Sequence, residues 1–172
     1  LRAARAGRAT SVGACPTFGT APPPRFLCVN AQHLAHPAVS ADVTIKVEQL
    51  LKFVIRVQRL EATGCAVVTS AVESLDDEVL RLFDKGHTRA DFLAAVTLCR
   101  DAGVTLVPTF VAFHPWLTLA SYCDLLDTIA ALDLIDHLSP IQLAIRLLVP
   151  QGSRLLELEE IRAHLGAFDG AT

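Results

Sequence analysis

Apolar and polar positions along the chain follow a pattern that predicts strands alternating with helices. Residues 65–73 are rich in β-branched side chains and too short for a helix, so we expect a buried strand that begins after Gly64 and ends at Glu73. Residues 42–48 alternate between apolar and polar side chains, which is typical of a strand with one buried face. Further strands are predicted at residues 104–113 and 137–148.

Serine, threonine and acidic residues mark the positions where helices are expected to begin. Ser74 and Asp77 match a capping box, in which two side chains satisfy free backbone N–H groups, so a helix is predicted from there to near Gly86. Thr88 and Asp91 repeat this motif before a second helix. Other helices are predicted at residues 49–62, 119–132 and 153–165.

The apolar residues of two predicted helices recur at helical spacing and are expected to face the core. In the helix that follows Thr88 they are Phe92, Ala95, Val96, Cys99 and Ala102. In the helix over residues 119–132 they are Leu119, Tyr122, Cys123, Leu126, Ile129 and Ala130. Each of these helices would then cover one face of a sheet.

Strands that alternate with helices of this length indicate repeated β-α units, whose strands pair in parallel. The chain is therefore predicted to be an α/β protein: a partial (β/α) barrel of about four parallel strands with flanking helices, its N-terminal strands missing. Alternating polar residues are equally expected in a sheet with one solvated face, so both arrangements stay open. Pro108 and Pro140 weaken the strand assignment, because proline cannot donate a ladder hydrogen bond.

The domain organisation follows the composition of the chain. Residues 1–30 contain four arginines, no acidic residue and three consecutive prolines, and they are left unassigned as a leader that is expected to be disordered. The barrel segment is predicted over residues 31–165 and a short tail over residues 166–172. Because the sequence starts at Leu1 and contains no methionine, it is interpreted as part of a longer product.

The composition also excludes several kinds of partner. A net charge of −3 and an aromatic content of 6% give no basic surface of the kind that binds nucleic acid. The five cysteines are odd in number and scattered, which indicates reduced thiols in a cytoplasmic protein. Residues 104–123 are apolar enough to resemble a membrane span, but Pro108 and Pro115 interrupt them, so no membrane partner is expected.

Polar side chains on the predicted strands indicate a ligand site. Because side chains alternate along a strand, Thr69 shares a face with Glu73, and Gln142 shares a face with Arg146. Thr109 lies in the same way on the strand between them. In a barrel these groups would gather at the C-terminal ends of the strands and would bind a small molecule. His114 follows the third strand and would face the same site.

Three consecutive segments of the chain resemble the radical S-adenosylmethionine (radical SAM) superfamily. They read GCAVVTSAVESLDDEVLRLFDKGHTRADF, GVTLVPTFVAFHPWLTL and HLSPIQLAIRLLVPQGSRLLEL. An upstream segment, HPAVSADVTIKVEQLL, resembles the preceding strand, so the likeness spans about residues 31–165. Within the superfamily the chain is most similar to a group of proteins with a cysteine-rich C-terminal tail.

The resemblance implies two cofactors and a set of site residues. Members of the superfamily hold a [4Fe–4S] cluster and S-adenosylmethionine (SAM), whose reductive cleavage yields a 5′-deoxyadenosyl radical. On this pattern Glu73 corresponds to a residue near the ribose or the methionine moiety, and Lys85 to a cation that pairs with the carboxylate of SAM. Thr109 corresponds to a polar position on the next strand, and Gln142 to a residue on the strand beside the adenine.

One departure from the superfamily limits the expected activity. Its cluster is held by a Cys-x-x-x-Cys-x-x-Cys loop, a spacing that this sequence does not contain and that Cys15 and Cys28 do not replace. The chain is therefore predicted to be a fragment of a radical SAM enzyme, inactive alone, whose partner is the missing N-terminal portion of its parent. The alternative is a cluster-less barrel that acts as a binding or structural module. A metal-independent barrel lyase is disfavoured, because Lys46 is the only lysine inside a predicted strand.

Overall fold

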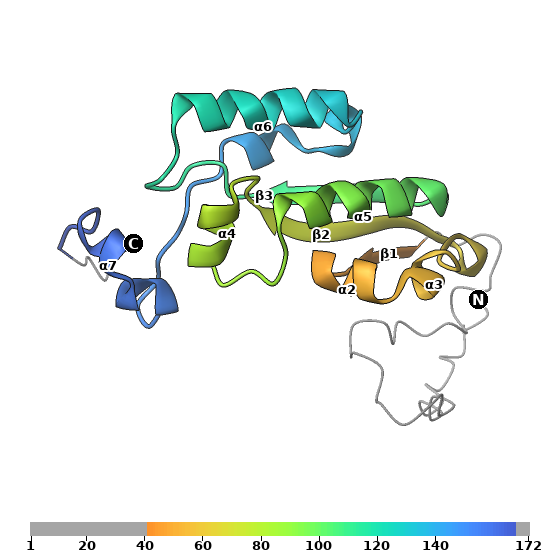
Figure 1. The fold of residues 1–172 in the computed structure, drawn as a ribbon, viewed down its shortest axis with the longest axis horizontal. Helices are drawn as coiled ribbons and strands as arrows, with labels where there is room; N and C mark the ends of the chain where they lie inside the picture. Colours follow the sequence, from red (N-terminus) through yellow and green to blue (C-terminus); the bar gives the residue numbers. More distant parts are fainter. Residues whose placement is uncertain (1–40, 168–172) are drawn as a thin grey trace, which may run out of the picture.

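The structure of the protein is a computed structural model that describes residues 41–167 (Figure 1). The predicted leader at residues 1–30, the start of the barrel segment and most of the tail at residues 166–172 lie outside the described residues. Within residues 41–167, strands and helices alternate along the chain, as the pattern of apolar positions predicts.

The strands form one parallel sheet in the order β1-β2-β3. They are β1 (Ala41–Thr44), β2 (Cys65–Glu73) and β3 (Thr105–Phe110). In the register of the sheet, Thr69 of β2 lies opposite Thr44 on one side and Val107 on the other. Parallel strands with helical connections confirm the α/β class and the partial (β/α) barrel.

The helices vary in length, and several of them pack against one face of the sheet. The α-helices of the described residues are α2 (Val47–Lys52), α3 (Val54–Val57), α4 (Asp77–Leu82), α5 (Arg89–Asp101), α6 (Leu119–Ala131) and α7 (Glu159–Arg162). The 3₁₀ helices are η2 (Glu61–Thr63), η3 (Ile135–His137), η4 (Pro140–Leu143) and η5 (Arg154–Glu157). Figure 1 shows α5 running alongside the sheet and the segment with α7 extending away from it. Over residues 41–167, each helix is too short or too polar to cross a bilayer.

The predicted fourth strand is wrong for most of its length. Residues 137–148 contain the end of η3, all of η4 and a single isolated parallel bridge at Arg146. Pro140 opens η4, where its missing N–H leaves no helical hydrogen bond unmade. Ile141 and Leu148 are 61% and 83% exposed, so the apolar run is a surface segment and not a buried strand.

The first β-α unit has a shorter strand and a more broken helix than predicted. The strand ends at Thr44 and not at residue 48, because the chain turns into α2. The backbone of Phe53, with φ −120° and ψ 44°, separates α2 from α3, so the helix predicted over residues 49–62 is not continuous. The predicted alternation still holds, since Val43, Ile45 and Val47 are buried.

Of the two predicted capping boxes, the structure contains one. The box of Thr88 and Asp91 is present at the start of α5, where the backbone N–H of each residue donates to the side chain of the other. The box predicted for Ser74 and Asp77 is wrong. Asp76 caps α4 instead, because its carboxylate accepts two backbone N–H groups of the first turn. Ser74 Oγ accepts the backbone N–H of Asp76 at 3.1 Å.

One face of the sheet carries the core. Val43, Val68 and Leu106, one from each strand, pack in a single cluster with buried residues of α2, α5 and α6. The residues predicted to face inward on α5, from Phe92 to Ala102, are all buried. The ring of Phe92 meets the ring of Phe110 edge to face, with centroids 6.1 Å apart. The covering helices and the strands therefore share one core.

The inward face predicted for α6 is largely wrong. Leu125, Thr128 and Ile129 are the buried residues of this helix, whereas Leu119 and Cys123 are exposed. Apolar residues occupy much of the circumference of α6, so spacing alone does not fix which side packs. Only contacts with the rest of the fold select the buried side.

Candidate functional site

Glu73 ends β2 in an unusual backbone conformation. Its φ of 70° lies in the left-handed region, which residues other than glycine rarely adopt. The pairing of β2 with β3 also shifts register between Ala71 and Glu73, which turns the last residue of the strand out of the regular alternation. The carboxylate is thereby placed at the C-terminal edge of the sheet.

Lys85 brings a positive charge to this carboxylate. The loop between α4 and α5 returns to the end of β2, and Lys85 Nζ donates to Glu73 Oε1 at 2.8 Å. The two side chains are 29% and 20% exposed, so solvent screens this pair less than it screens a surface ion pair. The structure thus brings together two of the predicted site residues, and it leaves Glu73 Oε2 outside their hydrogen bond.

The other two predicted site residues lie along β3. Thr109 is half-buried and paired with Ala71, on the side of the sheet that faces away from the core. Gln142, in η4, lies beyond the edge of β3, where its Oε1 accepts the backbone N–H of Phe110 at 3.1 Å. The four predicted residues therefore surround the ends of β2 and β3 without converging on a single point.

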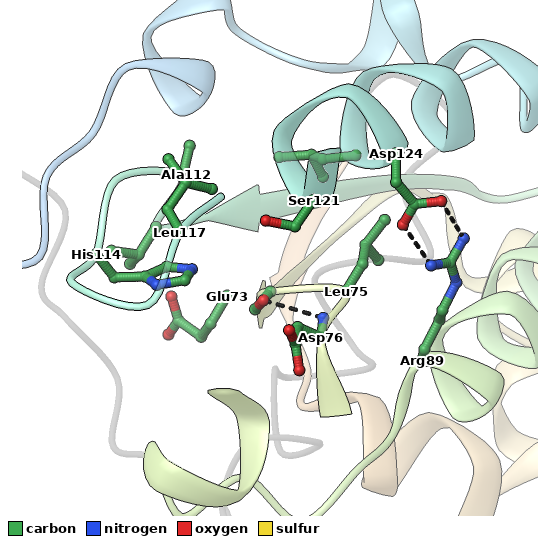
Figure 2. Close-up of a pocket in the computed structure, with 12 residues that line it drawn as sticks. Glu73, Leu75, Asp76, Arg89, Ala112, His114, Leu117, Ser121 and Asp124 are labelled. Carbon is green, nitrogen blue, oxygen red and sulfur yellow. Dashed lines mark hydrogen bonds and ion pairs between the residues drawn. The ribbon is translucent and has the colours of Figure 1, made fainter. Parts of the chain in front are cut away.

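A pocket of about 200 Å³ opens at the C-terminal ends of β2 and β3 (Figure 2). The loops that follow the two strands and the first turns of α5 and α6 line it. Figure 2 shows Glu73 and His114 on one side of the pocket, and Arg89 with Asp124 on the other. Of the residues predicted for a SAM site, Glu73 is the one that lines this pocket.

An ion pair between two helices closes one side of the pocket. Arg89, the first residue of α5, forms a bidentate pair with Asp124 of α6 and donates from Nη2 to Thr128 Oγ1 at 3.0 Å. The hydrogen bonds from Arg89 lower the pKa of Asp124, and the same contact raises the pKa of Arg89. These partners are 35 residues apart, so no local spacing in the sequence points to the pair.

His114 has a buried nitrogen that lacks a partner. Burial lowers the pKa of His114, and the nearby Asp76 carboxylate opposes this shift, so the ring is neutral near pH 7. The rings of Phe83 and Trp116 each lie 6.0 Å from the His114 ring, centroid to centroid. Within residues 41–167, Nδ1 finds no hydrogen-bond partner. A neutral imidazole in this position can accept one hydrogen bond from a ligand and donate another.

Comparison with known proteins identifies the fold. No protein-family model matches the sequence, and no curated protein is a significant match. Among solved structures, the chain is similar to the archaeal Methanocaldococcus infernus Elp3 with an N-terminal deletion, with 17% identity and a TM-score of 0.54. That match covers 73% of this chain and 28% of the Elp3 chain. The fold is of the radical SAM type.

The cobalamin-dependent S-adenosylmethionine radical enzyme OxsB is also similar. With aqua-cobalamin bound it has 16% identity and a TM-score of 0.49, and the match covers 78% of this chain and 20% of that chain. With aqua-cobalamin and S-adenosylmethionine bound, the TM-score is 0.48 at 16% identity, over 74% of this chain and 18% of that chain. The chain spans less than a third of the length of each of these proteins.

The cysteines of the described residues do not fit a [4Fe–4S] cluster, although the fold is of the radical SAM type. Cys65 on β2 and Cys99 on α5 are buried, and burial raises the pKa of Cys99 to about 11. Cys123 is exposed on α6. Between residues 41 and 167, no three cysteine, histidine or acidic side chains are grouped as metal ligands. A cluster needs converging thiolates, which Cys65, Cys99 and Cys123 on their separate elements do not provide.

Polar groups at and beside the pocket have hydrogen-bonding capacity for a ligand that carries amino, carboxylate or hydroxyl groups. Glu73 Oε2 and the second carboxylate oxygen of Asp76 stand outside the hydrogen bonds of their residues and can accept from amino or hydroxyl groups. The His114 side chain lines the same pocket. Lys85 Nζ makes one hydrogen bond and has further N–H groups for a carboxylate.

Proposed function

We propose that this chain binds SAM at the C-terminal ends of β2 and β3, as one part of a radical SAM enzyme that acts on a small molecule. The observation that carries the proposal is the Glu73 carboxylate at the edge of a pocket, held by Lys85 at 2.8 Å, in a fold of the radical SAM type. Bound SAM would supply the deoxyadenosyl group on which this chemistry depends.

The chain contributes binding and orientation of SAM. Glu73 accepts hydrogen bonds from the ribose or the amino group, and Lys85 pairs with the carboxylate of the methionine moiety. Thr109 offers a hydroxyl on the open face of the sheet. Gln142, whose Oε1 is already engaged by Phe110, has its amide N–H groups available for the adenine.

We propose further that the chain alone assembles no cluster and is catalytically inactive without a part that carries the Cys-x-x-x-Cys-x-x-Cys loop. The separation of Cys65, Cys99 and Cys123 on three different elements supports this. Their free thiols also support a cytoplasmic location. Anaerobic reconstitution with iron and sulfide tests the first point: we expect no bound iron, and about four irons per chain would contradict it.

Titration with SAM tests the binding itself. Without a cluster to anchor its amino and carboxylate groups, SAM is expected to bind with a Kd near millimolar, about −4 kcal/mol. Saturation-transfer NMR detects binding in this range, and Glu73→Ala should abolish it. The control is Glu157→Ala, which removes an exposed carboxylate from η5. Equal binding to both variants would place the site elsewhere.

A cluster-less module that binds or supports a partner is the second candidate. It is favoured by the ion pair of Glu73 with Lys85, which satisfies both charges without any ligand. This candidate is supported if NMR spectra show a folded chain and SAM at about ten millimolar gives no saturation-transfer signal.

A further inference from the structure

We propose that His87 is the positioning residue of the candidate site: it holds the strained turn that aims Glu73 at the pocket. The inference rests on the proposed function only in treating Glu73 as the residue that contacts the ligand. His87 does not line the pocket, and it acts through the backbone of β2.

The end of β2 is a tight turn centred on Glu73. The backbone N–H of Ser74 donates to the carbonyl oxygen of Val72 at 2.9 Å, which closes three residues around Glu73 with its φ of 70°. Three-residue turns with a positive φ at the centre are rare and strained. Such a conformation persists only where the surrounding structure determines it. The Glu73 carbonyl accepts the backbone N–H of Val111 at 2.9 Å, which holds the turn on the β3 side. The contacts of the Val72 carbonyl hold its other end.

His87 supplies the second contact of that carbonyl. Its side chain is 2% exposed, and its Nε2 lies 3.2 Å from the Val72 oxygen. A carbonyl oxygen only accepts hydrogen bonds, so Nε2 must carry the proton. The Val72 oxygen thus accepts from Ser74 within the turn and from His87, which lies 15 residues further along the chain. The contact from His87 fixes the turn relative to the rest of the fold.

One short loop contacts both the side chain of Glu73 and the backbone that precedes it. Lys85 binds the carboxylate, and His87, two residues later, binds the carbonyl that precedes Glu73. Between them, Gly86 lies against the Glu48 side chain, so that a Cβ at Gly86 would meet Glu48 Cδ at 3.4 Å. The Nδ1 atom of His87 lies 3.8 Å from Glu48 Oε2, beyond hydrogen-bond distance, and it has no hydrogen-bond partner within residues 41–167. Glu48 therefore packs against the loop from the side of α2 without a hydrogen bond to His87.

Two substitutions at His87 separate its hydrogen bond from its bulk. His87→Gln keeps an N–H donor at the position of Nε2, whereas His87→Phe keeps the ring and removes the donor. His137→Phe in η3, where the histidine is exposed, is the matched control. The backbone φ of Glu73 is measured in the isotope-labelled chain from its HN–Hα coupling and its Cα and Cβ chemical shifts.

The left-handed signature of Glu73 is expected in the wild type, in His87→Gln and in His137→Phe, and it should be lost in His87→Phe. A His87→Phe variant that keeps its sheet resonances and the left-handed signature would overturn the proposal. Loss of the signature in His87→Gln would also overturn it, because the donor alone should suffice.

A measurement on the wild type decides the question if His87→Phe does not fold. The ring ¹⁵N chemical shifts of His87 report which nitrogen carries the proton, and the hydrogen bond to Val72 requires a proton on Nε2. A proton found on Nδ1 alone would overturn the proposal. These readouts need no SAM, so they remain decisive even where SAM binding fails. Where SAM does bind, binding should be lost in His87→Phe and kept in His87→Gln.

Discussion

The two faces of the three-stranded sheet lie in opposite environments. The helices cover one face, where three strand residues are almost fully buried: Val43, Val68 and Leu106. On the other face the matching residues are half-buried or exposed within residues 41–167: Thr44, Thr69 and Val107. The contrast shows that the folding free energy is concentrated on the helical side, which leaves the open face and the strand ends free to serve a ligand or the rest of a barrel.

Thiol chemistry should give the largest contrast between covered and open positions. Cys99 is buried under the helical face and has a pKa of about 11, whereas Cys123 is exposed on α6. Because the thiolate is the nucleophile, iodoacetamide at about pH 8 should modify Cys123 at least about 100 times faster than Cys99. Peptide mass spectrometry measures both rates. Comparable rates in the native chain, before addition of urea, would contradict the burial of Cys99.

Removal of a large core side chain should cost the most stability. Phe92 is fully buried and contacts Phe110 edge to face. Phe92→Ala is expected to lower the free energy of unfolding by about 3–5 kcal/mol, because it leaves a cavity. Phe113 is 43% exposed beyond the end of β3, so Phe113→Ala should cost less than half as much. Urea denaturation measures both changes, and equal losses would argue against a one-sided core.

Two valines compare the faces directly. Val68 is fully buried on the helical face, and Val107 is half-buried on the open face of the neighbouring strand. Val68→Ala should destabilise the chain by about 1.5–3 kcal/mol, and Val107→Ala by less than about 1 kcal/mol. If another part of a barrel covered the open face in solution, the two values would approach each other.

The ion pair beside the pocket should contribute least. The side chains of Arg89 and Asp124 are 37% and 47% exposed, so Asp124→Asn is expected to cost less than about 1 kcal/mol near pH 7. The pKa of Asp124 is lowered in the folded chain, so its contribution is present above the unfolded pKa of about 3.9 and is lost as pH falls below it. Urea unfolding of wild type and variant should therefore differ most above about pH 5, and the difference should shrink as pH falls through the lowered pKa of the folded chain. A difference that does not shrink with falling pH would contradict this.

The sequence predicts best those features that depend on local pattern. Three predictions that depend only on residues close in sequence match the structure. They are the β-branched run of β2, the inward residues of α5, and the capping box of Thr88 and Asp91. The resemblance names Glu73 and Lys85 as site residues, and the structure places their side chains in contact. Their role in binding SAM stays a prediction.

Features that depend on tertiary context could not be predicted. Residues 137–148 have strand-like composition, but Pro140 favours a 3₁₀ helix. At the edge of β3, the side chain of Gln142 accepts the backbone N–H of Phe110, where a neighbouring strand would otherwise pair. The buried side of α6 is set by the core, which selects Thr128 over more apolar neighbours. The pairing of Arg89 with Asp124 and the contact of His87 with Val72 join distant elements, for which the sequence has no local signal.

Gln142 occupies a backbone hydrogen-bond donor at the β3 edge of the sheet. An added strand needs free backbone N–H and C=O groups along the edge that it joins. Beside β3, the amide oxygen of Gln142 occupies the N–H of Phe110, and the backbone of Phe113 is taken by the bridge to Arg146. The addition of a strand from another chain is therefore opposed at the C-terminal end of β3, the end where the pocket opens.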